Sequence, residues 1–332
     1  MSVHGIYQEL LLSPRIISFY PDSIELECPR RRLTVDGLDA DEQYLDLAMF
    51  NRRSRLRSLI FRLENQVAWQ FPPASHSISN EPEDIRRLWN GIVSEYSTKR
   101  LTDPDDKLPA ISALAAEFHR FLGDHYLAGL WEGNLIDSLL WTRFIEFPPS
   151  SQEPSYRIPT WSWASINDAS IRPHYPWTYG VKSTNAKVLH YSVDLVSPEA
   201  PFSHVKGGEL SVRGPLKRMS LRESWERFFW GRATNNFYDT KSIGIIWPDF
   251  RYDLPKDASM QSMLGIPPDQ ESLFFLGLLS TRPEDTCETC GPVLIRTGDN
   301  QYERVGLFEV RIDLFPVIPS VQQLVAMDHW GR

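Results

Sequence analysis

Residues 188–195 read Val-Leu-His-Tyr-Ser-Val-Asp-Leu and carry the clearest secondary-structure signal in the chain. The apolar residues at positions 189, 191, 193 and 195 alternate with polar residues at positions 190, 192 and 194. Strict alternation places one set of side chains on each face of an extended chain. The stretch therefore predicts a β-strand with one buried and one solvated face.

Similar short apolar runs follow this strand and precede it. They predict six more strands, over residues 160–164, 209–213, 242–247, 273–279, 293–296 and 302–312. In the last of these, Val305 and Leu307 lie on one phase, whereas Phe308 and Val310 continue on the other, so Gly306 marks a predicted β-bulge. Seven strands predict a β-rich C-terminal domain, sandwich-like or barrel-like.

The first half of the chain has helical periodicity instead. The spacing of the apolar residues predicts a helix over 81–96 whose buried face is Ile85, Leu88, Trp89, Ile92, Val93 and Tyr96. A second helix is predicted from Leu108 to Leu122, with Asp105 or Asp106 as its N-cap. Residues 126–141 predict two short helical pieces, the second capped by Asn134.

These patterns predict an α+β protein with a definite domain plan. Short strand-like pieces at 10–12, 16–20 and 24–26 begin a mostly helical region over residues 1–147. A Pro- and Ser-rich linker follows at 148–159, then the β-rich domain at 160–316 and a C-terminal tail at 317–332.

Charge and composition limit the function classes. The 332 residues carry a formal charge of -8, which argues against nucleic acid or an anionic membrane as the main partner. A basic run, Arg52, Arg53, Arg55, Arg57 and Arg62, is interpreted as a solvated helix face. The chain has no run of about 18 apolar residues, and residues 1–20 are not expected to act as a signal peptide. Three cysteines suit a reducing compartment, so we expect a cytoplasmic protein.

Several residue groups were weighed as sites of chemistry. Cys287 and Cys290 form a lone Cys-x-x-Cys in a predicted loop, short of the four ligands of a zinc site. The acidic run at 103–106 lacks the glycine and glutamate of a calcium loop and reads as helix capping. His119 and His125 are six apart, on different helix faces, and are expected at the surface. We therefore predict no catalytic, cofactor-binding or metal site.

Four blocks of sequence occur in a distinctive order. The first is Gln8-Glu9 with Ser13-Pro14-Arg15. The second is Asp106-Lys107-Leu108-Pro109, followed by Tyr126, Ala128-Gly129-Leu130-Trp131 and Trp141. The third is Pro159 with Trp161-Ser162-Trp163-Ala164-Ser165, and the fourth contains Arg304 and Gly306. Together they resemble the region that follows the HET domain in fungal heterokaryon-incompatibility proteins.

The resemblance implies a role in allorecognition and programmed cell death when incompatible filamentous hyphae fuse. The family's HET domain, thought to be distantly similar to the TIR fold, has no counterpart here, so the trigger of cell death is expected upstream. Our leading hypothesis is a non-catalytic regulatory or interaction region with protein partners, and the motif residues are expected to be structural. The sequence also leaves open a fragment or a degenerate paralogue.

Two further alternatives come from other function classes. By analogy with TIR domains, the complete protein is an NAD-cleaving enzyme whose active site lies upstream. Alternatively, the 11 tryptophans make a glycan- or ligand-binding module, provided that they are exposed. Core packing is the interpretation that we favour for the tryptophans, with Trp161 and Trp163 on one face of a strand.

Overall fold

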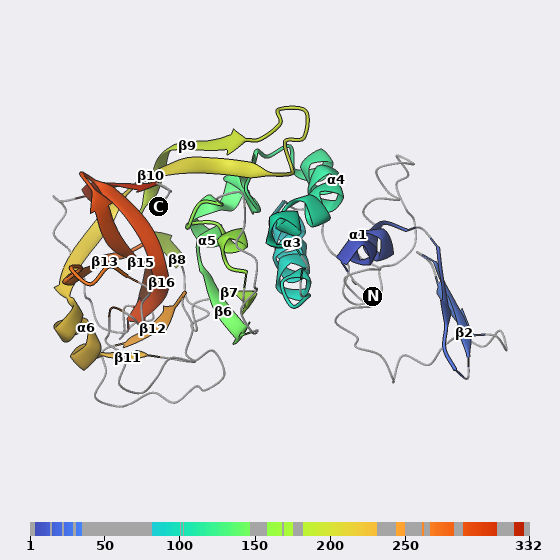
Figure 1. Ribbon diagram of the computed structural model, residues 1–332, viewed down its shortest axis with the longest axis horizontal. Coiled ribbons are helices and arrows are strands. Elements are labelled where there is room, and N and C mark those ends of the chain that lie inside the picture. The colour runs from blue at the N-terminus through green and yellow to red at the C-terminus, as the bar shows by residue number, and fades with distance from the viewer. Residues whose placement is uncertain are drawn as a thin grey trace. The chain divides into compact units, whose positions relative to one another are not determined.

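The computed structural model of the chain forms two compact units (Figure 1). One unit comprises residues 1–102 and 110–123, and the other comprises 103–109 and 124–332. The structure describes residues 4–13, 15–21, 23–28, 31–34, 82–99, 101, 103–146, 158–167, 169–174, 182–230, 244–249, 261, 266–281, 288–310 and 322–328. The predicted α+β class is confirmed, with a β-rich C-terminal unit. The units divide near residue 123, not at residue 147 as the sequence indicated.

In its described residues, the N-terminal unit combines three helices with a small sheet. Its helices are α1 (His4–Leu12), α3 (Pro82–Tyr96) and α4 (Ser112–Leu122), and its antiparallel strands, in the order β1-β2-β3, are β1 (Ile16–Phe19), β2 (Ile24–Cys28) and β3 (Arg31–Thr34). The six residues predicted as the buried face of α3 are the ones that it buries. The Trp89 and Phe118 rings meet edge to face at 5.1 Å, which joins α3 to α4.

Two expectations for the first 122 residues are corrected. Residues 10–12 belong to helix α1, because Tyr7 and Leu11, one helical turn apart, are both buried. The second predicted helix begins at Ser112, and two 3-10 turns precede it, η2 (Pro104–Lys107) and η3 (Pro109–Ile111). Asp103 caps η2 by accepting the Asp105 N–H at 3.0 Å, so neither of the predicted caps is the capping residue.

The C-terminal unit begins with short elements. They are β4 (Tyr126–Leu127), β5 (Leu130–Trp131), η4 (Glu132–Asn134), α5 (Leu135–Ser138), β6 (Trp141–Glu146), η5 (Trp163–Ser165) and β7 (Ala169–Pro173). The longer sheet follows, with β8 (Lys182–Thr184), β9 (Lys187–Leu195), β10 (Val205–Ser220), α6 (Leu221–Arg227), β11 (Phe228–Trp230), β12 (Gly244–Pro248), β13 (Ser272–Leu276), β14 (Leu279–Thr281), β15 (Glu288–Gly298), β16 (Gln301–Val310) and β17 (Gln322–Asp328).

Five strands of the large sheet close into a barrel-like ring. Strand β16 pairs with β17, β17 with β10, β10 with β13, β13 with β15, and β15 again with β16. An apolar cluster that includes Met219, Phe275, Val293 and Phe308 packs four of these strands together with residues of α6, β11 and β12. Burial of these side chains is the main stabilising contribution that the sheet makes.

The bulge predicted near Gly306 is confirmed. Val293 pairs with Gly306 and Leu294 with Arg304, so Val305 is the extra residue on β16. The bulge reverses the alternation, which lets Val305 and Phe308 both pack on the apolar cluster. As a consequence, Arg304 lies on the face of β16 opposite that cluster.

The remaining strand predictions are confirmed in part. Strands lie within or across five of the other predicted ranges, although residues 273–279 divide between β13 and β14. Residues 160–164 are not a strand, because Ser162 accepts the Ala164 N–H and starts the 3-10 turn η5. On β9, Leu189 is 40% exposed, since the β9–β10 pairing is irregular at this point.

Two further regions differ from the prediction. Residues 126–131 form the hairpin β4–β5 and not a helix, because Ala128 and Gly129 both have positive φ, as a two-residue hairpin turn requires. The predicted tail contains β17, which pairs with β10 over residues 322–328. The predicted linker, apart from residues 158 and 159, and the basic run at 52–62 lie outside the described residues. None of the helices described is long and apolar enough to cross a membrane.

Candidate functional site

The second and third sequence blocks meet at the β4–β5 turn. The Ser162 hydroxyl donates to the Ala128 carbonyl at 2.5 Å, and the Trp163 indole donates to the Gly129 carbonyl at 2.9 Å. Ser162 and Trp163 are buried. These bonds satisfy the carbonyls of a buried turn, which would be destabilising without partners.

The ring of Trp163 fits closely over this turn. A Cβ atom on Gly129 would lie 2.5 Å from the Trp163 Nε1 atom, and Gly129 has a φ of 102°. The Lys107 ammonium lies 5.8 Å from the centroid of a Trp163 ring, within cation–π range. Lys107 and Gly129 of the second block thus both contact Trp163 of the third block.

The fourth block joins the same region through Arg304. Its guanidinium carbon lies 3.4 Å from the Trp141 ring centroid, and Nη1 donates to the Leu139 carbonyl at 2.6 Å. Nη2 donates to the Trp141 carbonyl at 2.5 Å, while the Trp141 indole donates to the Trp161 carbonyl at 3.1 Å. We call Leu139, Trp141, Asp249 and Arg304 the Arg304 cluster.

Asp249 supplies the countercharge of the cluster. Its Oδ2 atom accepts from Arg304 Nε at 2.7 Å, and its backbone carbonyl accepts from Arg143 at 2.9 Å. Burial raises the pKa of Asp249 above its ordinary value, and the Arg304 charge offsets part of this rise. Burial likewise lowers the pKa of Arg304, against the Asp249 charge. A buried charge pair is stable only when its geometry is good and further hydrogen bonds satisfy the remaining polar atoms.

A second polar side-chain pair lies further along β16. His174 Nε2 is 2.8 Å from Glu309 Oε2, with both side chains over 90% buried. The His174 ring packs on Trp247 at 4.7 Å between centroids. Arg304 and Glu309 therefore contact the β6–β7 region on the face of β16 that lies opposite the apolar cluster. Gly306, between them, would place a Cβ atom 2.9 Å from the Trp247 carbonyl oxygen.

The other motif residues also have structural contacts. In the first block, which belongs to the N-terminal unit, Ser13 ends helix α1 by donating its hydroxyl to the Glu9 carbonyl at 2.6 Å. Gln8 is half-buried, Arg15 is exposed, and Pro14 lies outside the described residues. In the C-terminal unit, Tyr126 packs edge to face on Trp131 at 5.1 Å. Six further motif residues are buried or half-buried: Leu108, Pro109, Leu130, Pro159, Ala164 and Ser165.

The described tryptophans are mostly buried. Trp89, Trp131, Trp141, Trp161 and Trp163 are each at most 3% exposed. This confirms core packing for these five of the 11 tryptophans. Trp225 of α6, at 42%, is the most exposed tryptophan that the structure describes.

A polar triad that the sequence did not indicate lies on the surface. His125 Nδ1 is 2.7 Å from Glu132 Oε2 and 3.0 Å from the Tyr191 hydroxyl. The hydrogen bond to Glu132 raises the pKa of Tyr191 to about 12, and the same bond lowers the pKa of Glu132. As expected, His125 is exposed, but its ring links η4 to β9.

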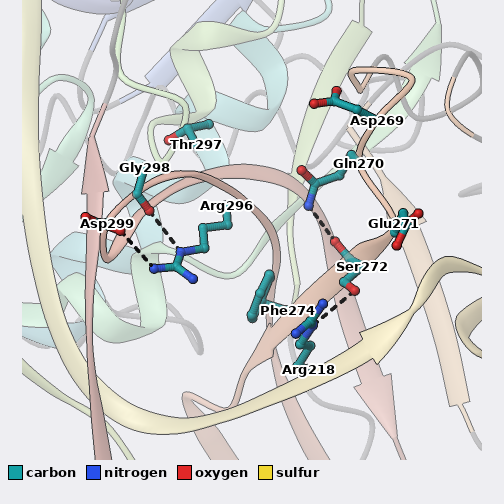
Figure 2. A pocket seen from close by; sticks show the side chains of 10 residues that line it. All are labelled: Arg218, Asp269, Gln270, Glu271, Ser272, Phe274, Arg296, Thr297, Gly298 and Asp299. Carbon is teal, nitrogen blue, oxygen red and sulfur yellow. Dashed lines mark hydrogen bonds and ion pairs between the residues drawn. The ribbon is translucent and has the colours of Figure 1, made fainter.

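The described part of the unit also contains an open hollow of about 630 Å³ (Figure 2). Arg218 of β10 and Phe274 of β13 are cross-strand partners in its wall, and Arg296 of β15 enters from another side. Arg218 Nε donates to the Ser272 hydroxyl at 3.1 Å. Asp269, Glu271 and Asp299 add carboxylates to the lining.

The remaining sequence candidates give no site of chemistry. Cys290 is buried in strand β15 and not in a loop, while Cys287 lies outside the described residues. Asp105 and Asp106 lie in the 3-10 turn η2, and Asp103, which was not one of the two predicted caps, caps this turn. Within the described ranges, no three His, Cys, Asp or Glu side chains are grouped closely enough to hold a metal ion.

Comparison with known proteins adds no relative. No protein-family model matches the chain, and no curated protein or solved structure matches it either.

Proposed function

We propose that this chain is a non-catalytic regulatory and interaction region that acts with a HET domain in fungal allorecognition and cell death. The resemblance of the four blocks is the basis of the family assignment. One observation carries the non-catalytic reading: the polar side chains of the second, third and fourth blocks bond to one another's backbone. Ser162, Trp163 and Arg304 all donate to buried carbonyls of these blocks or of the segments beside them.

An enzyme needs reactive groups that face a space where substrate binds. The Ser162 hydroxyl and the Trp163 indole are buried and donate their hydrogen bonds to backbone carbonyls within the fold. Arg304 is likewise committed to three partners, Leu139, Trp141 and Asp249. This use of the motif residues supports a scaffold that presents surfaces to protein partners, and we place its action in the cytoplasm.

Expression in a filamentous fungus tests the proposal. A strain that carries a HET-domain protein is fused to a tester strain, with or without this chain, and dye uptake scores dying cells. We expect the chain alone to cause no death, and to change the death caused by the HET-domain protein several-fold. Arg304→Ala should abolish that change, whereas Arg222→Gln on the exposed side of α6 should retain it.

Two results would contradict the proposal. Cell death that is the same with and without the folded chain would remove the regulatory role. Release of nicotinamide from NAD by the purified chain, lost in a variant that stays folded, would show a catalytic site and favour the enzymatic alternative.

A further inference from the structure

The hollow between β10, β13 and β15 holds more hydrogen-bond donors than the described protein uses. Arg218 is exposed, and among the described residues it donates a hydrogen bond only from Nε, to the Ser272 hydroxyl. No residue in the described part of the chain accepts from its two terminal nitrogens. Arg296 commits Nε to the Gly298 carbonyl at 2.9 Å and Nη2 to the fully exposed Asp299 at 3.3 Å. The paired terminal nitrogens of a guanidinium fit the two oxygens of a carboxylate.

An aromatic surface adjoins these donors. Phe274 is half-buried, and its ring meets Tyr302 edge to face at 5.2 Å. Because Arg218 and Phe274 are opposite one another on paired strands, their side chains leave the same face of the sheet. Figure 2 shows Phe274 and the Arg218 guanidinium next to each other in the wall. A ligand can therefore bring a charged group and an aromatic group to adjacent positions.

The rim limits how much negative charge the hollow accepts. Asp269, Glu271 and Asp299 contribute three carboxylates against the two guanidinium groups. The three carboxylates of the rim repel a multiply charged anion, whereas one arginine can pair with the single charge of a carboxylate ligand. The volume of about 630 Å³ lies in the range of small-ligand and side-chain sites.

We propose that this hollow binds a peptide segment of a partner protein that presents one carboxylate side chain beside an aromatic side chain. Arg218 takes the carboxylate through its terminal nitrogens, and the aromatic ring packs against Phe274. Gln270 helps to position the site, because its amide donates to the Ser272 carbonyl at 2.8 Å. This inference rests on the proposed function, in which the chain acts through protein partners.

The probe is the blocked dipeptide acetyl-Asp-Phe-amide, titrated into the full chain and followed by NMR of the peptide. We expect saturable binding that Arg218→Gln weakens about tenfold or more, the loss of a charge-assisted pair. Arg222→Gln is the matched control, since Arg222 is also exposed but lies on α6 and bonds to Glu226. Acetyl-Asn-Phe-amide and acetyl-Asp-Ala-amide should both bind more weakly than the probe.

Three outcomes would overturn the inference: equal binding of the Asn peptide, binding unaffected by Arg218→Gln, or tighter binding of phenyl phosphate than of the probe. The last would indicate a dianionic ligand instead of a peptide carboxylate. Far-ultraviolet circular dichroism of Arg218→Gln confirms that the variant is folded. If the probe fails but the chain still changes fungal cell death, only this hollow is wrongly assigned. If the probe binds but cell death is unchanged, the proposed function falls instead.

Discussion

The guanidinium of Arg304 lies over the Trp141 ring, 3.4 Å from its centroid, and donates at the same time to the Trp141 carbonyl. The two residues are 163 positions apart in the chain. The Arg304 side chain therefore stacks on Trp141 at the start of β6, donates to the backbone carbonyl of that residue and pairs with the Asp249 carboxylate. This joins strand β16 to the segment that carries the second sequence block.

Arg304→Ala should destabilise the C-terminal unit by about 3–5 kcal/mol, because it leaves the Asp249 carboxylate buried without its countercharge. Arg304→Lys should recover little of this, since one ammonium nitrogen cannot replace the three spaced nitrogens that reach Asp249, Leu139 and Trp141, or the planar stacking on Trp141. Urea denaturation gives the free energy of unfolding. Arg222→Lys, at an 86% exposed side chain, is the control and should change it by less than about 0.5 kcal/mol. A lysine variant as stable as the natural chain would contradict this account.

Gly129→Ala should destabilise the same unit for a separate reason. The added Cβ atom would lie 2.5 Å from Trp163 Nε1, and alanine is strained at a φ of 102°. We expect a combined loss of about 2–5 kcal/mol in the free energy of unfolding. Gly123→Ala, in the N-terminal unit, is the control for backbone strain alone, since Gly123 also has positive φ but has no atom within 4 Å of the added Cβ. It should cost about 1–2 kcal/mol. Equal losses would show that the contact with Trp163 contributes nothing.

Local pattern was sufficient for much of the fold. The buried face of α3 follows from apolar spacing alone, and the bulge at Val305 follows from a change of phase between Val305 and Phe308. Predictions from local pattern were wrong where contacts with distant side chains stabilise a different backbone conformation. Residues 126–131 have helical composition, yet the positive φ of Ala128 and Gly129 makes a hairpin that Ser162 and Trp163 hold from 34 residues away.

The candidate sites were harder to predict, because their partners are far apart in the sequence. Asp249 and Arg304 are separated by 55 residues, and His125 and Tyr191 by 66. No spacing rule links such residues, although the position of Arg304 in the fourth block marked it as special. The hollow around Arg218 had no signal in the sequence, since it depends on the register of β10 against β13.

The surface triad predicts a measurable titration. Glu132→Gln should lower the pKa of Tyr191 from about 12 toward 10.0, because the carboxylate that holds the phenol proton is gone. Carbon-13 NMR of labelled tyrosine rings reports this pKa directly. Glu226→Gln, on α6 and paired with Arg222, should leave it unchanged. Since the pKa of Tyr191 is raised in the folded state, its contribution to stability is present below pH 10 and is lost as the pH approaches 12. A Tyr191 pKa that stays near 12 in Glu132→Gln would refute the assignment.

The last strand gives a test of the closed ring. Strand β17 pairs with β10 from Glu209–Asp328 to Pro215–Gln322 and touches β16 at Gln301 and Tyr302. Removing residues 322–332 should open the ring, expose the β10 edge and leave the buried Met327 site empty. We expect a lower urea midpoint and association into larger species on size-exclusion chromatography. A chain that ends at Asp328 keeps all of these strand pairs and should behave as the full chain does. If the two truncations are equally stable and monodisperse, β17 does not close the ring in solution.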